Sequence, residues 1–401
     1  MNSTLLKSWF VAAVTGGVIA TARADGGEQL LVRLAPGESI DALAERYGAS
    51  IVSRYDPLRL YVLDLNDSGW GDAGATILAT DDAVLSAELN QIVHAIATGN
   101  SQSFFFNIAP TNYGTQPALG LMGIPVDQGS TLGQGVTVAI LDTGLSANEA
   151  LRAEVVPGFN FVDDSADTAD TRSGVDSNSD DRADSLAGHG TFVAGLVSLA
   201  APGCTLMPVK VLDSDGQGTA FSVAAGIDFA VNAGARIINL SMSFNHESSV
   251  VTEAIYNARR RGTLVVACVS NSGAMTATFP TTDPDVLAVA ATDLKDAKAP
   301  FSAFGSFVDI AAVGVSVVST LPDQGFATAS GTSFSAAWVT GAAAAVFSAY
   351  PEATPDAVRT RLVRSADRVL ATMRQFPGQL GSGRLNLSNA LHSGAIAAPP
   401  R

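Results

Sequence analysis

Val136-Thr-Val-Ala-Ile-Leu-Asp142-Thr-Gly144 is an almost unbroken apolar run that ends in a polar turn. A run of this kind indicates a strand covered on both faces, as strands of a parallel sheet are. Similar runs follow at 206–212, 236–241, 263–269, 286–291 and 307–312. Helical patterns lie between or after them at 191–199, 222–233, 251–260, 333–350 and 355–366. This alternation predicts an α/β fold in which a mostly parallel sheet carries helices on both sides.

Asp142 stands at the end of the first predicted strand, where sites form in open α/β sheets. Its Asp-Thr-Gly context occurs in two kinds of protease. An aspartic protease needs a second carboxylate that shares a proton with the first, and Asp67-Ser-Gly69 is the one candidate. That segment lies in the N-terminal part of the chain, where a turn is the simpler interpretation. The two parts also show different patterns, which disfavours a shared carboxylate pair.

Two helix starts carry the residues that a serine nucleophile needs. Gly188-His189-Gly-Thr-Phe-Val-Ala-Gly195 begins a helix of small residues, which can pack closely on a neighbouring element. Ser330-Gly-Thr-Ser333 begins the longest helical pattern. A Ser at a helix start is usually a cap, but the helix dipole and free N–H groups also favour negative charge beside it. A hydroxyl needs an adjacent base, and His189 is the candidate.

Asn271 follows the predicted strand at 263–269, in Val-Ser-Asn271-Ser-Gly. Its amide could donate a hydrogen bond to an oxyanion, and a simple turn is the alternative for this residue alone. In chain order, the segments around Asp142, His189, Asn271 and Ser333 resemble the subtilisin-like serine peptidases (subtilases, peptidase family S8). The spacings of 47 residues from Asp to His and 144 from His to Ser fit, as does the order Asp, His, Ser.

The resemblance covers about residues 135–391 and implies a subtilisin-like three-layer fold over residues 132–401. It implies a secreted serine endopeptidase that acts on polypeptides through an acyl-enzyme intermediate and requires no cofactor. Ser333 would be the nucleophile, His189 the base and Asp142 its partner. Asn271 and the N–H of Ser333 would hold the oxyanion. The segments that would pair with substrate backbone as edge strands are Gly216-Gln217-Gly218 and Ser241-Met242-Ser243.

Residues 28–95 show a separate pattern of small elements in the order β-α-β-β-α-β, the ferredoxin-like arrangement. The expected strands are 28–34, 51–55, 58–65 and 83–95, and the helices are 40–47 and about 73–79. Ser39 and Gly48 are expected to cap the first helix. By the resemblance, residues 25–95 are an inhibitor-like propeptide, an intramolecular chaperone and inhibitor that the enzyme removes from itself. Residues 96–131 are loop-like and are interpreted as a linker or processing region.

The N-terminus indicates export. Lys7, the apolar run Trp9–Ala20 and Ala22-Arg23-Ala24 predict a signal peptide over residues 1–24. The apolar run is shorter than the ~20 residues of a membrane span, so the protein is expected outside the cytoplasm, in the periplasm or the medium. Without residues 1–24 the chain has 21 basic and 38 acidic residues, a charge of −17. That charge argues against nucleic acid or anionic membrane as partners, and a monomer is expected.

Several positions depart from the family pattern. Ser270 precedes the oxyanion Asn where the family has Gly, and Ser243-Phe244 replaces a Gly pair, which adds bulk where a substrate's P1 side chain is expected. Ala337 and Trp338 replace a Pro and a His. These changes keep a second interpretation open: a catalytically weak or inactive subtilase-fold protein that retains its propeptide and binds peptides. A serine-carboxyl peptidase also has Gly-Thr-Ser, but uses Glu instead of His, so Gly-His-Gly-Thr disfavours it.

An acidic segment and two cysteines complete the candidates. Residues 163–184 hold eight aspartates and two arginines. Asp176, Asn178 and Asp180 alternate in a way that suits Ca²⁺, although the segment lacks the Gly and Glu of an EF-hand loop, and a solvated acidic loop is the alternative. Cys204 and Cys268 lie in strands that are not neighbours in the family's sheet order, so both thiols are predicted free. Cys268 is expected to border the specificity pocket.

Overall fold

The computed structural model describes residues 29–65, 71–96, 105–106, 110–126, 131–368, 375–392 and 394. It divides the chain into two compact units, Met1–Asn90 and Gln91–Arg401. The predicted signal peptide and Asp67-Ser-Gly69 lie outside the described residues. Within the ranges described, no helix is both long enough and apolar enough to cross a membrane.

The first unit is a four-stranded antiparallel sheet in the order β2-β3-β1-β4, with two helices against it. Its elements are β1 Gln29–Leu34, α1 Ile40–Tyr47, β2 Ser50–Tyr55, η1 Asp56–Leu58, β3 Leu60–Asp64, α2 Gly71–Leu78 and β4 Val84–Leu89. Both predicted caps of α1 are present. The Ser39 side chain accepts a hydrogen bond from Ala42 N, and Gly48 has the left-handed conformation that ends the helix. The small α+β unit is therefore as the sequence predicts.

One predicted strand of this unit is corrected by the structure. The sequence analysis placed residues 83–95 in a single strand, but the chain forms two. β4 pairs with β1 in the first unit, whereas β5, Ile92–Ala95, pairs with β11 and β13 in the second. The division falls at Asn90, five residues before the predicted boundary at residue 95. Alternating apolar residues run through both strands, so the pattern alone does not reveal the break.

The second unit is built on an eight-stranded sheet in the order β16-β15-β14-β12-β7-β10-β8, with β9 also pairing with β10. Every pairing in this sheet is parallel. The six longer strands are β7 Thr137–Asp142, β10 Thr205–Lys210, β12 Ile237–Leu240, β14 Leu264–Cys268, β15 Val286–Thr292 and β16 Ile310–Val313. The two short ones are β8 Glu154–Val155 and β9 Phe159–Asn160. The six predicted apolar runs correspond to the six longer strands.

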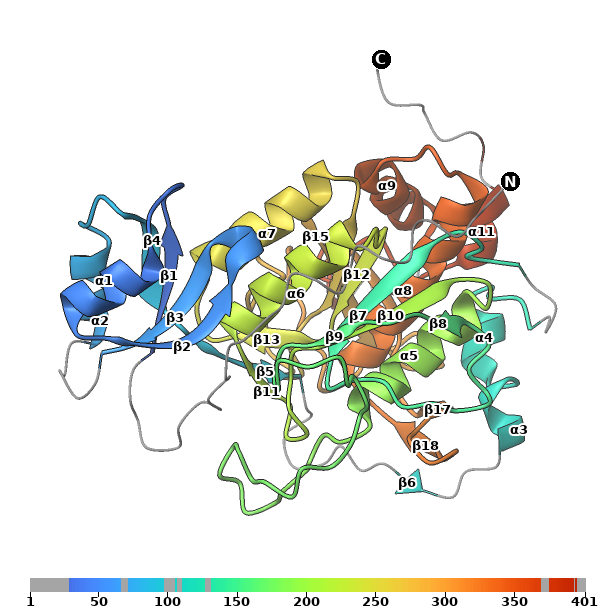
Figure 1. Ribbon diagram of the computed structural model, residues 1–401. Helices are drawn as coiled ribbons and strands as arrows, with labels where there is room; N and C mark the ends of the chain where they lie inside the picture. Colours follow the sequence, from blue (N-terminus) through green and yellow to red (C-terminus); the bar gives the residue numbers. More distant parts are fainter. Residues whose placement is uncertain are drawn as a thin grey trace, which may run out of the picture. The chain divides into compact units, whose positions relative to one another are not determined.

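Helices cover both faces of this sheet (Figure 1). They are α5 His189–Ala200, α6 Ala220–Asn232, α7 Ser249–Arg260, α8 Thr332–Ala349, α9 Pro355–Ser365 and α11 Leu387–His392. Val138 and Ile140 of β7 belong to the same core cluster as α5 and α8. A side chain at Gly226 of α6 would instead meet Leu141. Because neighbouring strand residues point to opposite faces, α6 lies on the other side, which gives the three-layer α/β fold.

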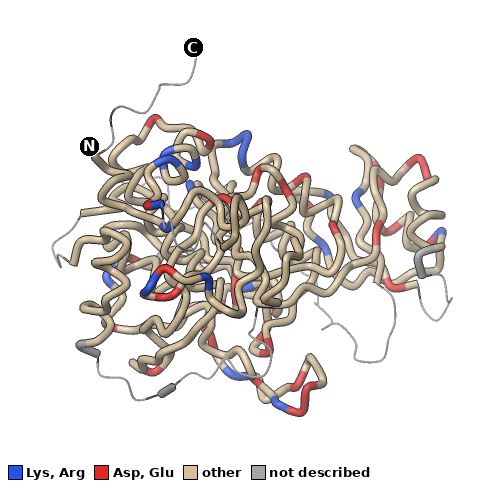
Figure 2. Tube along the Cα trace, turned by 180° about the vertical axis from the view of Figure 1, so that it is seen from behind, with Lys and Arg blue, Asp and Glu red and all other residues tan. Residues whose placement is uncertain are grey.

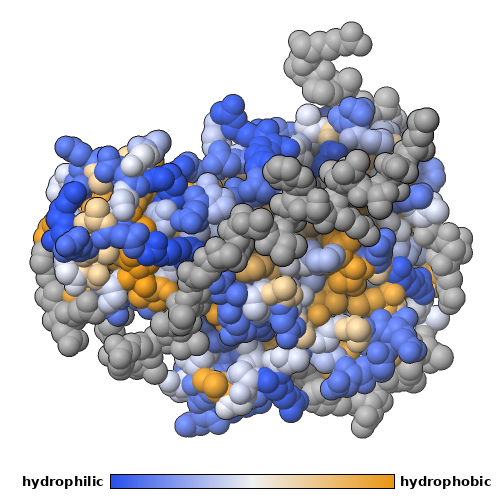
Figure 3. All heavy atoms as spheres, in the orientation of Figure 1, coloured by the Kyte–Doolittle hydropathy of each residue, from blue (hydrophilic) through white to orange (hydrophobic). Residues whose placement is uncertain are grey.

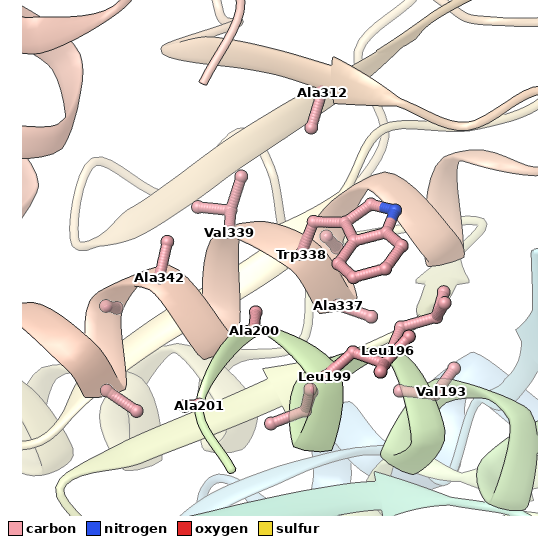
Figure 4. Packing of buried hydrophobic residues seen from close by; sticks show 14 of the residues in the cluster. Val193, Leu196, Leu199, Ala200, Ala201, Ala312, Ala337, Trp338, Val339 and Ala342 are labelled. Carbon is pink, nitrogen blue, oxygen red and sulfur yellow. The ribbon is translucent and has the colours of Figure 1, made fainter. Parts of the chain in front are cut away.

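Helices α5 and α8 pack directly on each other through small residues. A Cβ at Gly341 of α8 would lie 2.6 Å from Ala200 Cβ and 2.9 Å from Val197 O, so Gly is needed for this close approach. Nearer the start of α8, Trp338 fills the space beside Val193 and Leu196 (Figure 4). Trp338 is fully buried, and its Nε1 has no hydrogen-bond partner. The Trp at the family's His position is therefore a packing residue.

Part of the predicted linker is ordered and belongs to the second unit. Within residues 96–131 the structure has β6 Phe105–Phe106, α3 Pro110–Tyr113 and α4 Pro117–Leu121. Tyr113 donates a hydrogen bond to Gly195 O at 2.6 Å. The Gln116 side chain donates to Val318 O and accepts from Val318 N. Leu119, Met122 and Ile124 are buried in the core cluster. The expectation of a loop is wrong here because both helices are shorter than two turns and start at a Pro, which looks like loop composition.

Outside the grey atoms, Figure 3 shows a mainly hydrophilic surface on which apolar residues gather in a few patches. Hydrophobic residues make up 47% of the chain, and the structure buries most of the large ones. Two smaller sheets complete the second unit: β11-β5-β13 and β17-β18-β6. Their remaining strands are β11 Gln217–Thr219, β13 Met242–Phe244, β17 Val317–Thr320 and β18 Phe326–Ala329. The first of these sheets leads to the candidate site.

Candidate active site

Asp142 and His189 form a buried pair. Asp142 is the last residue of β7, and His189 is the first residue of α5. His189 Nδ1 lies 2.7 Å from Asp142 Oδ1, which also accepts a hydrogen bond from Thr143 N. A Cβ at Gly190 would lie only 2.1 Å from Gly144 O and 3.2 Å from Asp142 Cβ. The Gly after the His is therefore required, because it lets the helix approach the strand end closely.

The environment of His189 acts on its basicity in two directions. Burial by itself lowers the pKa of His189, because it disfavours the charged imidazolium. The charge of Asp142, its hydrogen bond and the more distant charge of Asp170 raise the pKa, and the raising effects win. His189 Nε2, the nitrogen that faces away from Asp142, is buried and has no hydrogen-bond partner. This imidazole is a stronger base than an ordinary histidine, with one nitrogen free to accept a proton.

Ser333 lies in the first turn of α8, directly after Thr332. Its Oγ is 3.5 Å from Ile96 O and 3.8 Å from Cys268 Sγ, and it is fully buried. The ring of Phe334 stacks near His189, with centroids 5.8 Å apart. The hydroxyl therefore lies beside a backbone carbonyl of the chain itself.

Asn271 directs its amide at the same carbonyl. Its Oδ1 accepts hydrogen bonds from Thr332 N at 3.1 Å and from Thr332 Oγ1 at 3.0 Å. A backbone N–H can only donate, so this contact fixes which side of the amide is oxygen. The Nδ2 group then points the other way and donates to Ile96 O at 3.1 Å. One carbonyl oxygen is thus within reach of both the Ser hydroxyl and an amide donor.

Residues 92–96 bring the Ile96 carbonyl to Ser333 and Asn271 by forming a strand between β11 and β13. β5 pairs antiparallel with β11 on one side and with β13 on the other. Ala95 N donates to Gly216 O at 2.7 Å, and Ile96 N donates to Ser241 O at 3.2 Å. His94 is paired with both Gln217 and Ser243. All six predicted substrate-binding residues flank this strand: Gly216, Gln217, Gly218, Ser241, Met242 and Ser243.

Two of the departures from the family pattern have local explanations. The Ser270 hydroxyl donates to Ser272 Oγ at 3.0 Å. Phe244 lies opposite Val93, three residues before Ile96, and its ring packs edge-on against Phe279 with centroids 5.1 Å apart. The bulk of Phe244 is therefore accommodated by Phe279 and does not lie at the register of Ile96.

Acidic residues are frequent in the loop before α5 (Figure 2). Several of them accept local hydrogen bonds from the backbone. Asp176 accepts from the backbone N–H groups of Asp180 and Asp181, and Asn178 also accepts from Asp180 N. Among the described residues, no group of three or more His, Cys, Asp or Glu side chains is arranged to hold a metal ion. Calcium at Asp176, Asn178 and Asp180 stays a prediction.

Both cysteines are free, as predicted, and both are buried. Burial raises the pKa of each thiol to about 12. Cys268 ends β14 and lies directly behind the hydroxyl of Ser333. Sequence reasoning placed it at the pocket border and did not foresee this contact with Ser333.

The comparisons with known proteins agree with this arrangement. The model of the subtilase family (Peptidase_S8) matches residues 133–384. The chain belongs to the subtilase family. It is 35% identical to subtilisin BL from Lederbergia lenta over 267 residues, which is 64% of this chain and 91% of that one. It is 34% identical to thermitase from Thermoactinomyces vulgaris over 270 residues, 65% of this chain and 89% of the relative.

A solved structure, fervidolysin from Fervidobacterium pennivorans, matches with a TM-score of 0.73 at 22% identity. The match covers 95% of this chain and 63% of that one, so the likeness in fold extends beyond the family model. The subtilase is a serine endopeptidase, and polypeptides are its substrates. The family is the one that the sequence motifs indicated.

Proposed function

We propose that this subtilase is an exported endopeptidase that uses Ser333, His189 and Asp142 as its catalytic triad and removes its own N-terminal segment. Ser333 Oγ attacks the substrate carbonyl, and His189 Nε2 takes the hydroxyl proton. Asp142 holds the imidazole through Nδ1 and stabilises its charge. His189 then gives the proton to the leaving amine, and water completes hydrolysis of the acyl-enzyme. The 2.7 Å contact of Nδ1 with Asp142 supports the pairing of these two residues. Among the described residues, Nε2 has no hydrogen-bond partner, Ser333 included, so no other acceptor competes for it.

Asn271 is proposed to stabilise the oxyanion together with the N–H of Ser333. In the tetrahedral intermediate the carbonyl oxygen becomes negative, and donors already directed at it need no rearrangement. Asn271 Nδ2 is held in that direction by Thr332. The start of α8 adds the positive end of a helix dipole. Both effects favour the charged intermediate over the neutral substrate.

The observation that carries the proposal of self-processing is the place of Ile96. Its carbonyl oxygen is 3.1 Å from the Asn271 amide and 3.5 Å from Ser333 Oγ. Its N–H is bonded to Ser241 O, within the double edge pairing of β5. A substrate cleaved by Ser333 would need this arrangement. We therefore propose that the enzyme cleaves its own chain after Ile96, and that the mature protein starts at Ala97.

The segment before Ile96 also suggests a substrate preference. A Cβ at Gly216 would lie 3.0 Å from Ala95 Cβ and 2.3 Å from Leu186, so space beside Ala95 is narrow. Val93 is fully buried. A peptide with the sequence Val-His-Ala-Ile before the cleaved bond, as in residues 93–96, is therefore expected to be a good substrate. Removal of residues 25–96 would open the two edges to such peptides.

The test is intact mass and N-terminal sequencing of the exported protein, wild type beside Ser333→Ala. The wild type should begin at Ala97, and the variant should keep the N-terminal segment from Asp25. A charged variant, Ile96→Asp, should process slowly because it places a carboxylate in a buried apolar position. Two uncleaved chains would overturn the proposal and favour the alternative, an inactive peptide-binding protein that retains its propeptide.

Export and calcium are separate parts of the proposal. A start at Asp25 in the Ser333→Ala chain recovered outside the cytoplasm would support the signal peptide, whereas a start at Met1 would count against it. Excess chelator should lower the melting temperature if Asp176, Asn178 and Asp180 hold Ca²⁺, because a ligand of the folded state stabilises that state. An unchanged melting temperature would count against a calcium site.

A further inference from the structure

Asp170 is the most buried carboxylate of the acidic loop, and it lies beside the catalytic pair. Only 2% of its surface is exposed, although the sequence groups it with seven other aspartates of a polar segment. It comes 19 residues before His189 and belongs to no regular element. A buried carboxylate needs partners, since an unpaired one is very costly. Its partners are all at the two chain segments that carry Asp142 and His189.

Four donors point at the carboxylate. Asp170 Oδ1 accepts from Gly188 N at 2.9 Å and from Thr143 Oγ1 at 3.0 Å. Oδ2 accepts from Thr191 N at 3.0 Å and from Thr191 Oγ1 at 2.8 Å. Gly188 and Thr191 lie on either side of His189, and Thr143 directly follows Asp142. One carboxylate thus ties the start of α5 to the end of β7.

The same contacts replace a local helix cap. The N-cap of α5 is Gly188, which has no side chain to accept from the first N–H groups. Thr191 N is satisfied by Asp170 and Gly190 N by Thr143 Oγ1, at 2.9 Å. The Thr143 hydroxyl accepts the N–H of Gly190 and donates its own proton to Asp170 Oδ1. The residues before and after His189 are therefore all held by hydrogen bonds: Gly188 and Thr191 bond Asp170, and Gly190 bonds Thr143.

We propose that Asp170 is a positioning residue of the active site, which fixes the start of α5 and, through Thr143, the end of β7, so that His189 and Asp142 stay aligned. This inference rests on the proposed triad. Asp170 touches neither substrate nor the reacting atoms, and it acts through His189. It lies outside the segments around Asp142, His189, Asn271 and Ser333 that carry the resemblance to the family.

The charge of Asp170 provides a signature that a purely structural role would lack. The charges that act on His189 are those of Asp142 on β7 and of Asp170. Lys210 on β10, whose Nζ donates to Thr143 O, acts on Asp170. Cys268 on β14 is a neutral thiol with a pKa of about 12. Both carboxylates raise the pKa of His189. Burial raises the pKa of Asp170 itself, and its hydrogen bonds and the charge of Lys210 oppose that rise. The four donors favour the charged carboxylate, so removing this charge should lower the pKa of His189 and move the acid limb of activity to lower pH.

The central variant is Asp170→Asn. Each carboxylate oxygen accepts from two donors, so the amide NH₂ must face donors on whichever side it lies, which leaves buried groups unpaired. We expect kcat on a Val-His-Ala-Ile chromogenic peptide to fall about 10²-fold, the order of loss for a misplacement near 1 Å. KM should change little, because β11 and β13 are untouched. The acid limb of kcat/KM should shift to lower pH.

Asp215→Asn is the matched control. Asp215 is also buried, and its two oxygens accept from Ser177 N and Ser185 N in the same loop. Asp215→Asn should destabilise the loop without shifting the acid limb of the kcat/KM profile. An Asp170→Asn enzyme with the wild-type acid limb and kcat within about threefold of wild type would overturn the proposal. So would an equal shift of the acid limb in Asp215→Asn.

A second pair keeps the proposal testable if Asp170→Asn does not fold. Thr143→Val removes the hydroxyl that links Asp170 to Gly190, and Thr143→Ser retains it. We expect Val to lower kcat about tenfold with KM unchanged, a tenfold loss being near 1.4 kcal/mol in the barrier, and Ser to restore kcat. Equal kcat values for both would overturn the proposal. Failure of the triad itself is distinguishable, since Ser333→Ala would then keep its activity.

Discussion

The two helices that meet in the active site begin in different electrostatic surroundings. Neither α5 nor α8 has a side-chain cap on its N-cap residue, which is Gly188 in one and Gly331 in the other. At α5 a buried carboxylate from the preceding loop, Asp170, accepts hydrogen bonds from the N–H groups of Gly188 and Thr191. At α8 the acceptor of Thr332 N is a neutral amide, Asn271.

This difference suits the proposed roles of the two helix starts. Each helix has a partial positive charge at its N-terminus. At α5 that charge faces Asp170, and the base His189 sits among negative groups that raise its pKa. At α8 no carboxylate is among the contacts of Thr332, Ser333 or Asn271 that the structure describes. The positive end of α8 is then left for the negative charge that develops on the substrate.

The largest effect should come from making the start of α8 resemble that of α5. Asn271→Asp has nearly the same shape, but it puts a carboxylate where the oxyanion forms. We expect kcat to fall on the order of 10⁴-fold, because a donor is lost and a repulsive charge is added. Asn271→Ala, the control, loses the donor and the acceptor of Thr332 N but adds no charge, and its loss should be about 10²–10³-fold, as for this type of donor in a subtilisin. Steady-state kinetics on the peptide substrate would compare them. Equal losses would show that charge at this helix end does not matter.

The next effect concerns the packing that holds the two helices together. Trp338 of α8 is fully buried beside α5 (Figure 4). Trp338→Ala should reduce the free energy of unfolding by about 3–5 kcal/mol because it leaves a large cavity. Chemical denaturation in the Ser333→Ala background avoids self-digestion. Trp338→Phe is the control, and it should cost less than about 2 kcal/mol, since Nε1 has no partner to lose. Similar losses for both variants would contradict a role in packing alone.

The sequence predicts the strand and helix that carry Asp142 and His189 better than the residues that hold these side chains in position. The strand before Asp142 and the helix after His189 are visible because continuous apolar runs and small residues are local features. Asp170 could not be identified, because its four donors come from residues far along the chain and its neighbours are solvated aspartates. A buried role for one Asp in an acidic loop has no local signal. The same holds for Cys268, whose contact with Ser333 depends on how β14 and α8 pack.

Two boundaries were missed for a related reason. β4 and β5 are separated only by Asn90 and Gln91, and both show alternating apolar residues. Which sheet each strand joins depends on partners elsewhere in the chain, so period alone predicts one strand. The sequence predicts a loop for residues 96–131 because the helices within it are short, although Tyr113 and Met122 are buried. Tertiary contacts decide such segments.

The pH dependence tests the α5 side of the comparison. The pKa of His189 is raised above its ordinary value near 6.5. The base must be neutral to accept a proton, so activity is lost as pH falls through the raised pKa, at a higher pH than for an ordinary histidine. A pH profile of kcat/KM measures it. Asp142→Asn should move the acid limb of kcat/KM to lower pH. A wild-type enzyme whose acid limb lies below about pH 6.5 would contradict the prediction.

The smallest effect is expected behind the nucleophile, at Cys268. Its Sγ is 3.8 Å from Ser333 Oγ, and burial raises the pKa of the thiol to about 12, so it stays neutral and acts mainly by filling space. Cys268→Ala should leave kcat within about threefold of wild type, because a thiol is a weak hydrogen-bond partner. Cys268→Val adds a methyl group to a fully packed site and should displace the hydroxyl, with a loss near tenfold. If Ala were as damaging as Val, the thiol itself would be orienting Ser333, and the start of α8 would then depend on a buried contact much as α5 depends on Asp170.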